Sequence, residues 1–290
     1  MCQGFHQQYS HLTLIRCKVK YLTYDNDVFY LKKLVIFIKE VCMGYVFDFN
    51  DAIYYEEWLK DPKNRFAVDL EKRLMLSALK PVHGESILDI GCGTGPGLQT
   101  FLDMGLRVTG LDPSPYMLDV ASKNIGHRVD LHRGFAEDLP FDDNSFNYAC
   151  LMTTLEFVEN PKKALEEACR VAKDKIFLGV LNRYAIKGVQ RRIKGVFTRT
   201  IYNHACFFSI WELKGIIRSL LGDVPISWRT VLQFSASPGL ITSKIEQFSL
   251  IQKCPFGAFI GMGVTPVPRF RTRPLTVPYK TKHTTSEVPG

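Results

Sequence analysis

Three glycines and two aspartates carry the clearest chemistry in this sequence. Gly91, Gly93 and Gly95 alternate directly after a short apolar run, and glycine lets a backbone turn sharply and pass close to a ligand. Asp112 ends the next apolar run, where a carboxylate can accept hydrogen bonds from both hydroxyls of a ribose. Asp89 adds a negative charge near the turn, which would repel a phosphate and suits a cationic ligand. The pattern predicts a site for an adenosine-containing cofactor.

The spacing of these glycines argues against a dinucleotide. The dinucleotide fingerprint G-x-G-x-x-G needs a third glycine, which allows close packing of a helix whose start receives the pyrophosphate. From Gly91 and Gly93 that residue would stand at position 96, which is Pro96. From Gly93 and Gly95 it would stand at position 98, which is Leu98. The fingerprint therefore fails in both registers.

Four stretches in order carry a family resemblance. They read LDIGCGTG at 88–95, GLDPSPYML at 110–118, AEDLPF at 136–141 with DNSF at 143–146, and LEFVENP at 155–161 with ALEE at 164–167. Together they resemble the motifs of the class I S-adenosylmethionine-dependent methyltransferases, in the branch of the ubiquinone and menaquinone biosynthesis enzymes and many small-molecule methyltransferases. The resemblance is strong over about residues 50–181. One glycine motif alone would be weak, whereas four ordered motifs argue against chance.

The resemblance implies a fold, a cofactor and a reaction. We expect an α/β fold with a seven-stranded, mostly parallel Rossmann-like sheet and helices on both faces. The cofactor would be S-adenosylmethionine, with S-adenosylhomocysteine as product, and the acceptor a small, apolar or partly anionic molecule. Methyl transfer from a sulfonium needs mainly alignment of the acceptor, so few catalytic residues are expected.

The resemblance also implies which residues contact the cofactor. Asp112 would bind the ribose, and Asp89 would act near the amino group of the cofactor, unless its hydrogen bonds are purely structural. Phe135 departs from the family, which usually has Asp or Asn there, and this leaves a polar contact with the adenine in doubt. The predicted cofactor-binding residues are Tyr54, Asp89, Gly91, Cys92, Gly93, Gly95, Asp112, Pro113, Met117, Phe135, Ala136, Glu137, Met152 and Thr153.

Several of these assignments have plainer alternatives. Glu156 is the candidate base or acceptor-positioning group, and a carboxylate at a helix N-terminus explains it equally well. Glu137 is expected to reach the adenine amine or to be a solvated loop carboxylate. Tyr54 precedes the sheet on a helix that would fold over the cofactor, although core packing is the commoner role for an aromatic residue. His204 either lines the acceptor pocket or is simply packed.

Strands alternate with helices from position 86 on, which predicts a parallel sheet with right-handed crossovers. A capping box is expected at Ser209 and Glu212, and the last strand is expected to be antiparallel. The expected strands are 86–90, 107–111, 129–133, 146–152, 175–181, near 227–234 and near 245–252, and the expected helices are 65–79, 96–104, 114–123, 161–171 and 209–221.

Composition narrows the class of protein. With 290 residues, 46% of them hydrophobic, the chain can bury one substantial core. Its eight cysteines form no C-x-x-C pair, so we expect no metal site, free thiols and a cytoplasmic location. Lys32, Lys33, Lys39 and Glu40 bound the apolar run at 34–38 and leave it too short for a transmembrane helix, and no secretory signal is clear.

The expected organisation is one domain with appendages. Residues 46–265 would form the methyltransferase domain, with a basic insertion or cap near 182–208, and residues 266–290 a mobile basic tail. Residues 1–45 form an extension of unknown role. It is an added strand or helix, a disordered leader, or an upstream start before a natural one near Met43.

Two other functions are considered: the net charge of +8 and the basic stretch at 183–199 raise the first, and Phe135 together with the lack of a clear base raises the second. A nucleic-acid methyltransferase is one, but position 151–154 lacks the Asn/Asp-Pro-Pro-aromatic tetrapeptide of exocyclic-amine nucleic-acid methylases, and no RNA-binding module is recognised. A cofactor-binding protein without catalysis is the other. The basic stretch itself is a solvated loop, a cover for the active site, or a peripheral contact with an anionic membrane.

Overall fold

The computed structural model describes residues 44–185, 204–232 and 248–266. Within them lies one seven-stranded sheet of order β3-β2-β1-β4-β5-β7-β6. All neighbours pair in parallel except that β7 is antiparallel to both β5 and β6, so the expected fold is confirmed. The strands are β1 Ser86–Ile90, β2 Arg107–Asp112, β3 Asp130–Arg133, β4 Phe146–Met152, β5 Ala172–Leu181, β6 Ile226–Val231 and β7 Phe259–Val264.

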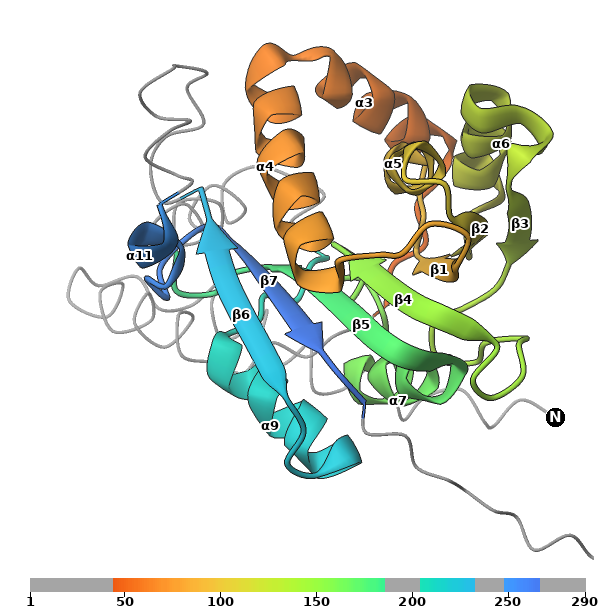
Figure 1. Ribbon diagram of the computed structural model, residues 1–290. Coiled ribbons are helices and arrows are strands. Elements are labelled where there is room, and N and C mark those ends of the chain that lie inside the picture. The colour runs from red at the N-terminus through yellow and green to blue at the C-terminus, as the bar shows by residue number, and fades with distance from the viewer. Residues whose placement is uncertain (1–43, 186–203, 233–247, 267–290) are drawn as a thin grey trace, which may run out of the picture. The chain divides into compact units, whose positions relative to one another are not determined.

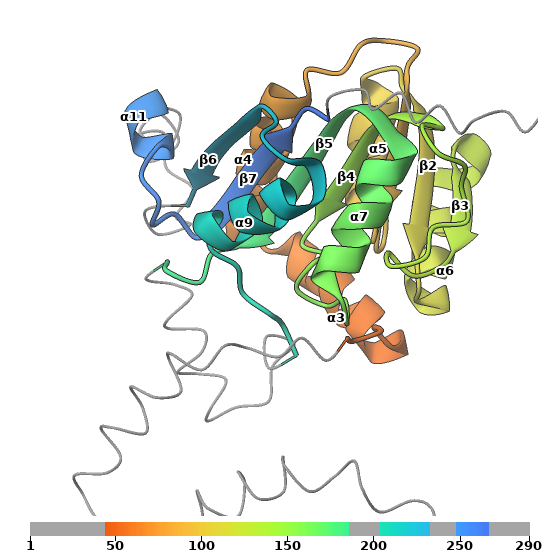
Figure 2. The same cartoon turned by 90° about the horizontal axis from the view of Figure 1, so that it is seen from below.

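Helices cover both faces of this sheet. α4, α5 and α6 pack on one face and α7 and α9 on the other, as the two views in Figures 1 and 2 show. α3 lies beyond the first layer, against α4 and α6. The helices are α3 Phe49–Lys60, α4 Pro62–Leu79, α5 Pro96–Asp103, α6 Pro115–Ile125, α7 Pro161–Val171, α9 Ile210–Leu221 and α11 Ser249–Gln252, and a 3₁₀ turn spans Gly126–Arg128.

Local sequence explains where the helices begin. Four of them start with proline, which has no amide donor to leave unpaired in a first turn. The side chains of Asp61, Ser114 and Asn160 accept hydrogen bonds from the first turns of three of these helices. Ser209 and Glu212 form the predicted capping box at the start of α9.

The core has two halves, one on each face of the sheet. Because side chains alternate along a strand, Leu88 and Ile90 of β1 pack toward α7 while Ile87 packs toward α4 and α5. All three are fully buried. The alternation also directs Asp89 to the α5 face, where Gly97 opens the first turn of α5 directly over its carboxylate.

The last strand was placed wrongly from sequence. Residues 249–252 form α11, and the strand that completes the sheet is β7 at Phe259–Val264. Gly261 and Gly263 make this segment a poor match to a strand in sequence, because glycine is disfavoured inside strands. Helix packing nevertheless requires Gly261. A Cβ at Gly261 would lie 2.6 Å from Leu74 of α4, so the helix can approach the sheet only over glycine. Residues 245–247 lie outside the described residues.

The cysteines do not all match expectation. Cys92, Cys150, Cys169 and Cys254 are free thiols, as predicted. Cys206 is disulfide-bonded, so the expectation of free thiols throughout is wrong at this position. In the described residues no helix is long and apolar enough to cross a membrane.

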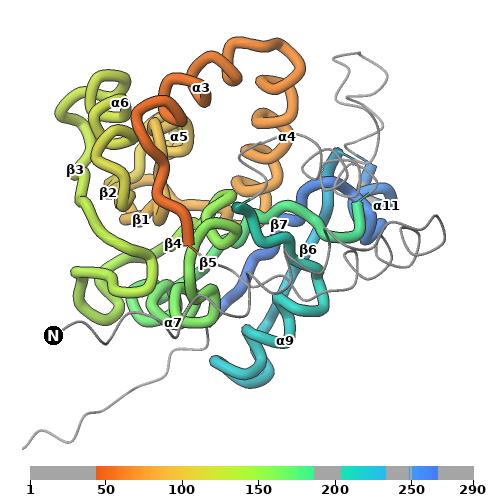
Figure 3. The backbone as a smooth tube through the Cα atoms, turned by 180° about the vertical axis from the view of Figure 1, so that it is seen from behind, coloured from red at the N-terminus to blue at the C-terminus, as the bar shows by residue number. Residues whose placement is uncertain are grey.

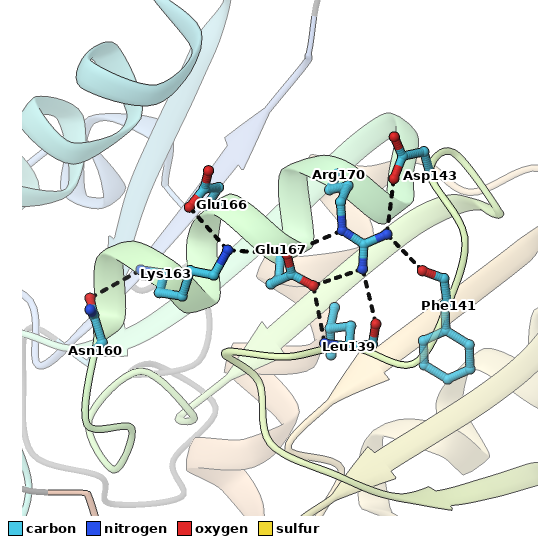
Figure 4. Close-up of polar contacts among 8 residues, drawn as sticks. All are labelled: Leu139, Phe141, Asp143, Asn160, Lys163, Glu166, Glu167 and Arg170. Carbon is cyan, nitrogen blue, oxygen red and sulfur yellow. Dashed lines mark hydrogen bonds and ion pairs between the residues drawn. The ribbon is translucent and has the colours of Figure 1, made fainter. Parts of the chain in front are cut away.

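A charge network on α7 holds the loop between β3 and β4 (Figure 4). Arg170 donates to the carbonyl oxygens of Phe141 and Leu139 at 2.7 and 2.9 Å and pairs with Asp143 at 3.0 Å. Glu167 accepts from Arg170 at 2.7 Å and from the Leu139 N–H at 3.1 Å. Burial raises the pKa of Glu167, but the Arg170 and Leu139 hydrogen bonds outweigh it and hold the pKa below its usual value.

Removing the guanidinium should destabilise the protein through this loop. We expect Arg170→Met to lower the free energy of unfolding by about 2 kcal/mol, because Glu167 keeps its buried charge, loses its closer ion-pair partner and keeps only the longer pair with Lys163. Chemical denaturation at pH 7 measures the loss. Lys163→Ala is the matched control, since Lys163 pairs with the same carboxylate from an exposed position; an equal loss in the two variants would contradict the role of Arg170.

Candidate functional site

The glycine turn connects β1 to α5 at the carboxyl edge of the sheet. The N–H groups of Gly91 and Cys92 both donate to the Leu111 carbonyl, at 2.7 and 3.1 Å, which ties the turn to the end of β2. Gly91, Gly93 and Gly95 all have positive φ, at 72°, 55° and 92°, a region that costs other residues about 1–2 kcal/mol. The three glycines predicted from sequence are therefore each required by the backbone itself.

The two outer glycines also face tight packing, whereas the central one faces open space. A Cβ at Gly91 would lie 2.4 Å from Thr154, and one at Gly95 would lie 2.7 Å from Ile125. A Cβ at Gly93 would meet nothing within 4 Å. The turn thus leaves room at its centre, where a ligand can approach the backbone.

Asp112 is fixed by two backbone groups. One carboxylate oxygen accepts from the Gly93 N–H and the other from the Ser114 N–H, both at 2.9 Å. Burial raises the pKa of Asp112, and these two hydrogen bonds oppose that rise. An ionised carboxylate has about four acceptor positions, so two remain for hydroxyl donors. Asp112 stands where the sequence placed it, buried but on the wall of a cavity.

That cavity has a volume of about 930 Å³. It opens at the carboxyl ends of β1, β2 and β4, the edge at which α/β sheets bind ligands. It is lined by Gly44, Tyr45, Val46, Phe47, Gly91, Leu111, Asp112, Pro113, Phe135, Ala136, Glu137, Thr153, Thr154, Phe157, Val158, Glu159, Asn160 and Lys163.

Six of the predicted cofactor-binding residues besides Asp112 lie on this wall, and seven do not. Those on the wall are Gly91, Pro113, Phe135, Ala136, Glu137 and Thr153. Phe135 is 58% exposed although it is a large apolar side chain, so its ring is available to a ligand. Thr153 has a positive φ of 52°, a strained conformation of the kind that clusters at functional sites. Those off the wall are Tyr54, Asp89, Cys92, Gly93, Gly95, Met117 and Met152.

Tyr54 and Met117 have clear positions away from the cavity wall. Tyr54 is 61% exposed on α3, and Met117 is buried in the first turn of α6. The segment before α3 takes the place expected for Tyr54. Tyr45, which was expected to belong to an N-terminal extension, donates its N–H to the Phe157 carbonyl at 2.7 Å.

This segment, Gly44–Phe47, was missed from sequence. Figure 3 shows it running from α3 down to the turn after β4. The Ser114 hydroxyl donates to the Phe47 carbonyl at 2.7 Å, and the Phe47 and Phe157 rings meet edge to face. The aromatic pair Tyr45 and Phe47 was the available signal. It carried no family motif, and only the structure pairs it with Phe157 and Ser114.

Asp89 is a buried acid beneath the turn. Its carboxylate is buried, a Cβ at Gly97 would lie 2.6 Å from one of its oxygens, and it is not on the cavity wall. Burial raises its pKa to about 7, with a further contribution from the charge of Asp112. These contacts fit a purely structural role for Asp89. A contact between Asp89 and the amino group of the cofactor stays a prediction.

Glu137 and Glu156 use their carboxylates on backbone groups. Glu137 accepts from the N–H groups of Glu159 and Asn160 at 2.9 and 3.2 Å, just before α7. Glu156 lies in a turn after β4, not at a helix N-terminus, and one of its oxygens accepts from the Leu181 N–H at 2.6 Å. The other oxygen is buried without a hydrogen-bond partner. Glu156 is not on the cavity wall, and its catalytic role stays a prediction.

His204 stacks on Tyr45, with ring centroids 4.4 Å apart. The residue is exposed and does not line the cavity. Among the described residues no cluster of histidine, cysteine and carboxylate side chains could hold a metal ion. Of the basic stretch at 183–199, only Arg183 lies inside the described residues; it donates to the Phe207 carbonyl at 2.7 Å and pairs with Glu212.

The effect of close packing at Gly91 can be separated from the effect of its positive φ by comparing alanine substitutions at two glycines. We expect Gly91→Ala to lower the free energy of unfolding by about 3 kcal/mol, the sum of left-handed strain and overlap with Thr154. Gly84→Ala is the control, because Gly84 has φ 84° but nothing near its Cβ, and it should cost only about 1 kcal/mol. Urea denaturation compares the two, and equal costs would contradict the close contact.

The buried acid Glu156 predicts a pH dependence. Burial raises its pKa to about 8, and Glu71 adds to the rise, so the folded protein binds a proton that the unfolded chain releases near pH 4. This contribution to stability is present below the unfolded pKa and is lost as pH rises toward 8.

Glu156→Gln should remove that loss, because an amide keeps the hydrogen bond to Leu181 and has no proton to release. Between pH 5.5 and 8 we expect its Tm to fall by about 5 °C less than that of the unaltered protein. Thermal melts by circular dichroism measure this. Glu159→Gln, at an exposed position, should behave like the unaltered protein, and a parallel fall in all three proteins would refute the buried-acid assignment.

Comparison with known proteins identifies the domain. Residues 88–178 match a family model described as a methyltransferase domain. An uncharacterised protein of Methanocaldococcus jannaschii is 37% identical over 135 residues, which are 46% of this chain and 62% of that protein. The demethylmenaquinone methyltransferase of Renibacterium salmoninarum is 40% identical over 102 residues, 35% of this chain and 43% of that enzyme. The chain thus spans less than two thirds of these relatives.

Solved structures agree with this assignment. A crystal structure of an S-adenosylmethionine-dependent methyltransferase from Thermotoga maritima, described as a possible histamine N-methyltransferase, is 25% identical to this chain. It matches with a TM-score of 0.59 over 76% of this chain and 98% of that one. The motifs, the sheet order and the family model agree, so the chain contains a class I S-adenosylmethionine-dependent methyltransferase domain.

Proposed function

We propose that this protein transfers the methyl group of S-adenosylmethionine to a small-molecule acceptor. The observation that carries the proposal is the Asp112 carboxylate, held by two backbone N–H groups on the wall of the cavity. Its two free acceptor positions suit the two hydroxyls of a ribose. The open space at Gly93 suits a ligand that lies over the turn.

The remaining walls suit an adenosine. Phe135 offers an exposed ring at the end of β3, and Ala136 is a small residue beside it. One carboxylate oxygen of Glu137 already accepts two hydrogen bonds just before α7. It therefore fixes this wall of the cavity and has fewer acceptor positions left for the adenine amine. The cofactor, when bound, supplies an electrophilic methyl group and its own leaving group.

The chain's own contribution to catalysis is then mainly placement. Segment 44–47 and Phe157 close one side of the cavity with aromatic and apolar surface, which excludes water. Two acids near the turn, Asp89 and Asp112, make it favourable for a cationic centre. A side-chain base is needed only where the acceptor carries a proton.

The acceptor is proposed to be a small molecule because the relatives bear such names. One is named for demethylmenaquinone and another for histamine, and these two molecules differ in chemistry. Neither name decides the acceptor here. Nucleic acid remains the alternative because of the six basic residues between 183 and 199, and a non-catalytic binding protein is the other.

Cofactor binding tests the Asp112 assignment. We expect Asp112→Ala to weaken S-adenosylmethionine binding about 100-fold in isothermal titration, because two hydrogen bonds to a charged group are lost. Asp119→Ala is the matched control, an exposed aspartate on the adjoining helix, and should bind normally. Circular dichroism shows whether each variant is folded. Unchanged affinity in folded Asp112→Ala would remove the ribose assignment.

Transfer of a labelled methyl group distinguishes the acceptor classes. Label should appear in low-molecular-weight products when a deproteinised metabolite extract is supplied, and not in total RNA. Label in RNA only, with binding that weakens steeply as salt rises, would favour the nucleic-acid alternative. Cofactor binding with no transfer to either would favour the non-catalytic one.

The same assay tests Glu156 once an acceptor is known. A general base contributes about 10²–10⁴-fold, so Glu156→Gln should lower kcat by at least that lower figure if the carboxylate takes a proton from the acceptor.

A further inference from the structure

Five large apolar side chains lie exposed near the outer end of the sheet. They are at least half exposed, with Leu250 at 80% and Tyr184 at 50%. A single exposed apolar residue needs no explanation, but a group of them marks an interaction surface. We name this group the apolar rim, and its members are Tyr184, Trp211, Phe248, Leu250 and Phe256.

Contacts connect three of the rim residues, Tyr184, Trp211 and Phe256. The Tyr184 and Trp211 rings meet edge to face with centroids 5.9 Å apart. The Asn182 side chain accepts from the Tyr184 N–H at 3.0 Å and donates to Pro255 and Gly257, the two neighbours of Phe256, at 2.7 Å each.

Of the other two rim residues, Leu250 lies in α11 and Phe248 directly precedes it. Phe248 accepts from the N–H of Gln252, and the side chain of Gln252 accepts from Arg229 of β6 at 3.0 Å. α11 lies beside the carboxyl end of β6 in Figure 1. The rim therefore follows the edge formed by the end of β5, the start of α9 and the segment that leads into β7.

The charges around the rim are positive. Lys253 and Arg229 are exposed, and Lys214 lies one turn after Trp211 on α9 with its ammonium 5.4 Å from the Trp228 ring. Residues 248–257 contain no acid. Glu212 is the acid next to Trp211, and it is paired with Arg183.

The sequence that follows Ala185 is also positively charged. Between positions 185 and 204 it holds five arginines and lysines and no acid. Residues 186–203 lie outside the described residues, so they enter only through their charge.

From this combination we propose that the apolar rim binds the surface of an anionic lipid bilayer. Trp and Tyr side chains have an apolar body and a polar tip, which suits the boundary between headgroups and acyl chains. Each nearby cation adds attraction to the negative leaflet. No membrane-spanning helix is needed for peripheral binding of this kind.

Charge argues against a second copy of the chain as the occupant. A two-fold interface would place the same patch on both partners, and Lys253 and Arg229 of each copy would approach one another. Like charges brought together at an interface disfavour association, whereas an anionic bilayer complements them.

A second exposed apolar surface provides the comparison. Phe49 and Ile53 on α3 are 57% and 48% exposed, one helical turn apart. Asp48, Asp51, Glu56 and Glu57 surround them in sequence, so an anionic membrane would repel this surface. It therefore matches the rim in apolarity but not in charge.

Vesicle co-sedimentation of the full chain tests the proposal. We expect binding to vesicles of phosphatidylcholine and phosphatidylglycerol in equal parts, at least about tenfold stronger than to phosphatidylcholine alone, and weaker at 500 mM than at 50 mM salt. Lys253→Ala should lower the partition coefficient about fivefold. The double variant Trp211→Ser with Phe256→Ser should lower it more than about tenfold.

The matched control is the double variant Phe49→Ser with Ile53→Ser, which should bind the anionic vesicles like the unaltered protein. Circular dichroism confirms that each variant is folded. Equal binding to neutral and anionic vesicles, no binding at all, or an equal loss in the control would overturn the proposal. A dimer in sedimentation velocity that the rim variant abolishes would assign the rim to a second copy instead and would also overturn it.

Discussion

The site depends on one carboxylate held by two backbone amides. Asp112 ends β2, and its oxygens accept from Gly93 in the turn after β1 and from Ser114 at the cap of α6. The turn after β1 and the start of α6 are thus both fixed to the side chain that ends β2. Ser114 extends the connection further, because its hydroxyl donates to the Phe47 carbonyl on the other side of the cavity. The wall of the cavity and the proposed ribose contact therefore share one set of hydrogen bonds.

Three carboxyl groups near this edge of the sheet are buried, and burial of a charged carboxylate is unfavourable. Asp89, Asp112 and Glu156 are all less than 10% exposed, and burial raises the pKa of each. None of the three has an ion pair among the described residues. Glu167, by contrast, is buried next to Arg170 and keeps a lowered pKa. Of these three acids only Asp112 lies on the cavity wall, whereas Glu167 on α7 of the opposite face is paired.

Local patterns predicted the parallel half of the fold well. Turn glycines, capping residues and short apolar runs lie next to one another in sequence, so β1 to β5 and α5 to α7 could be placed within a few residues. Asp112 and the three glycines could be found for the same reason. Their positions follow from the backbone of one β-turn-α unit.

Long-range contacts explain what could not be predicted. Segment 44–47 reaches the cavity because Tyr45 bonds to Phe157, more than a hundred residues away. Glu156 looked like a residue of the acceptor cleft or a helix cap, and its bond to Leu181 at the end of β5 is visible only in three dimensions. β7 was missed because its glycines disfavour a strand locally. Gly261 is nevertheless required, because Leu74 of α4 leaves no room for a Cβ there.

The position of β7 between β5 and β6 affects the order in which the domain folds during synthesis. β6 has no partner among the described strands other than β7, so it cannot join the sheet until a strand encoded later has arrived. On the ribosome, residues up to the end of β5 can assemble in order as neighbouring parallel strands, while β5 presents an open edge and β6 waits as an unpaired segment. Completion of this domain is therefore a late event that closes an exposed sheet edge.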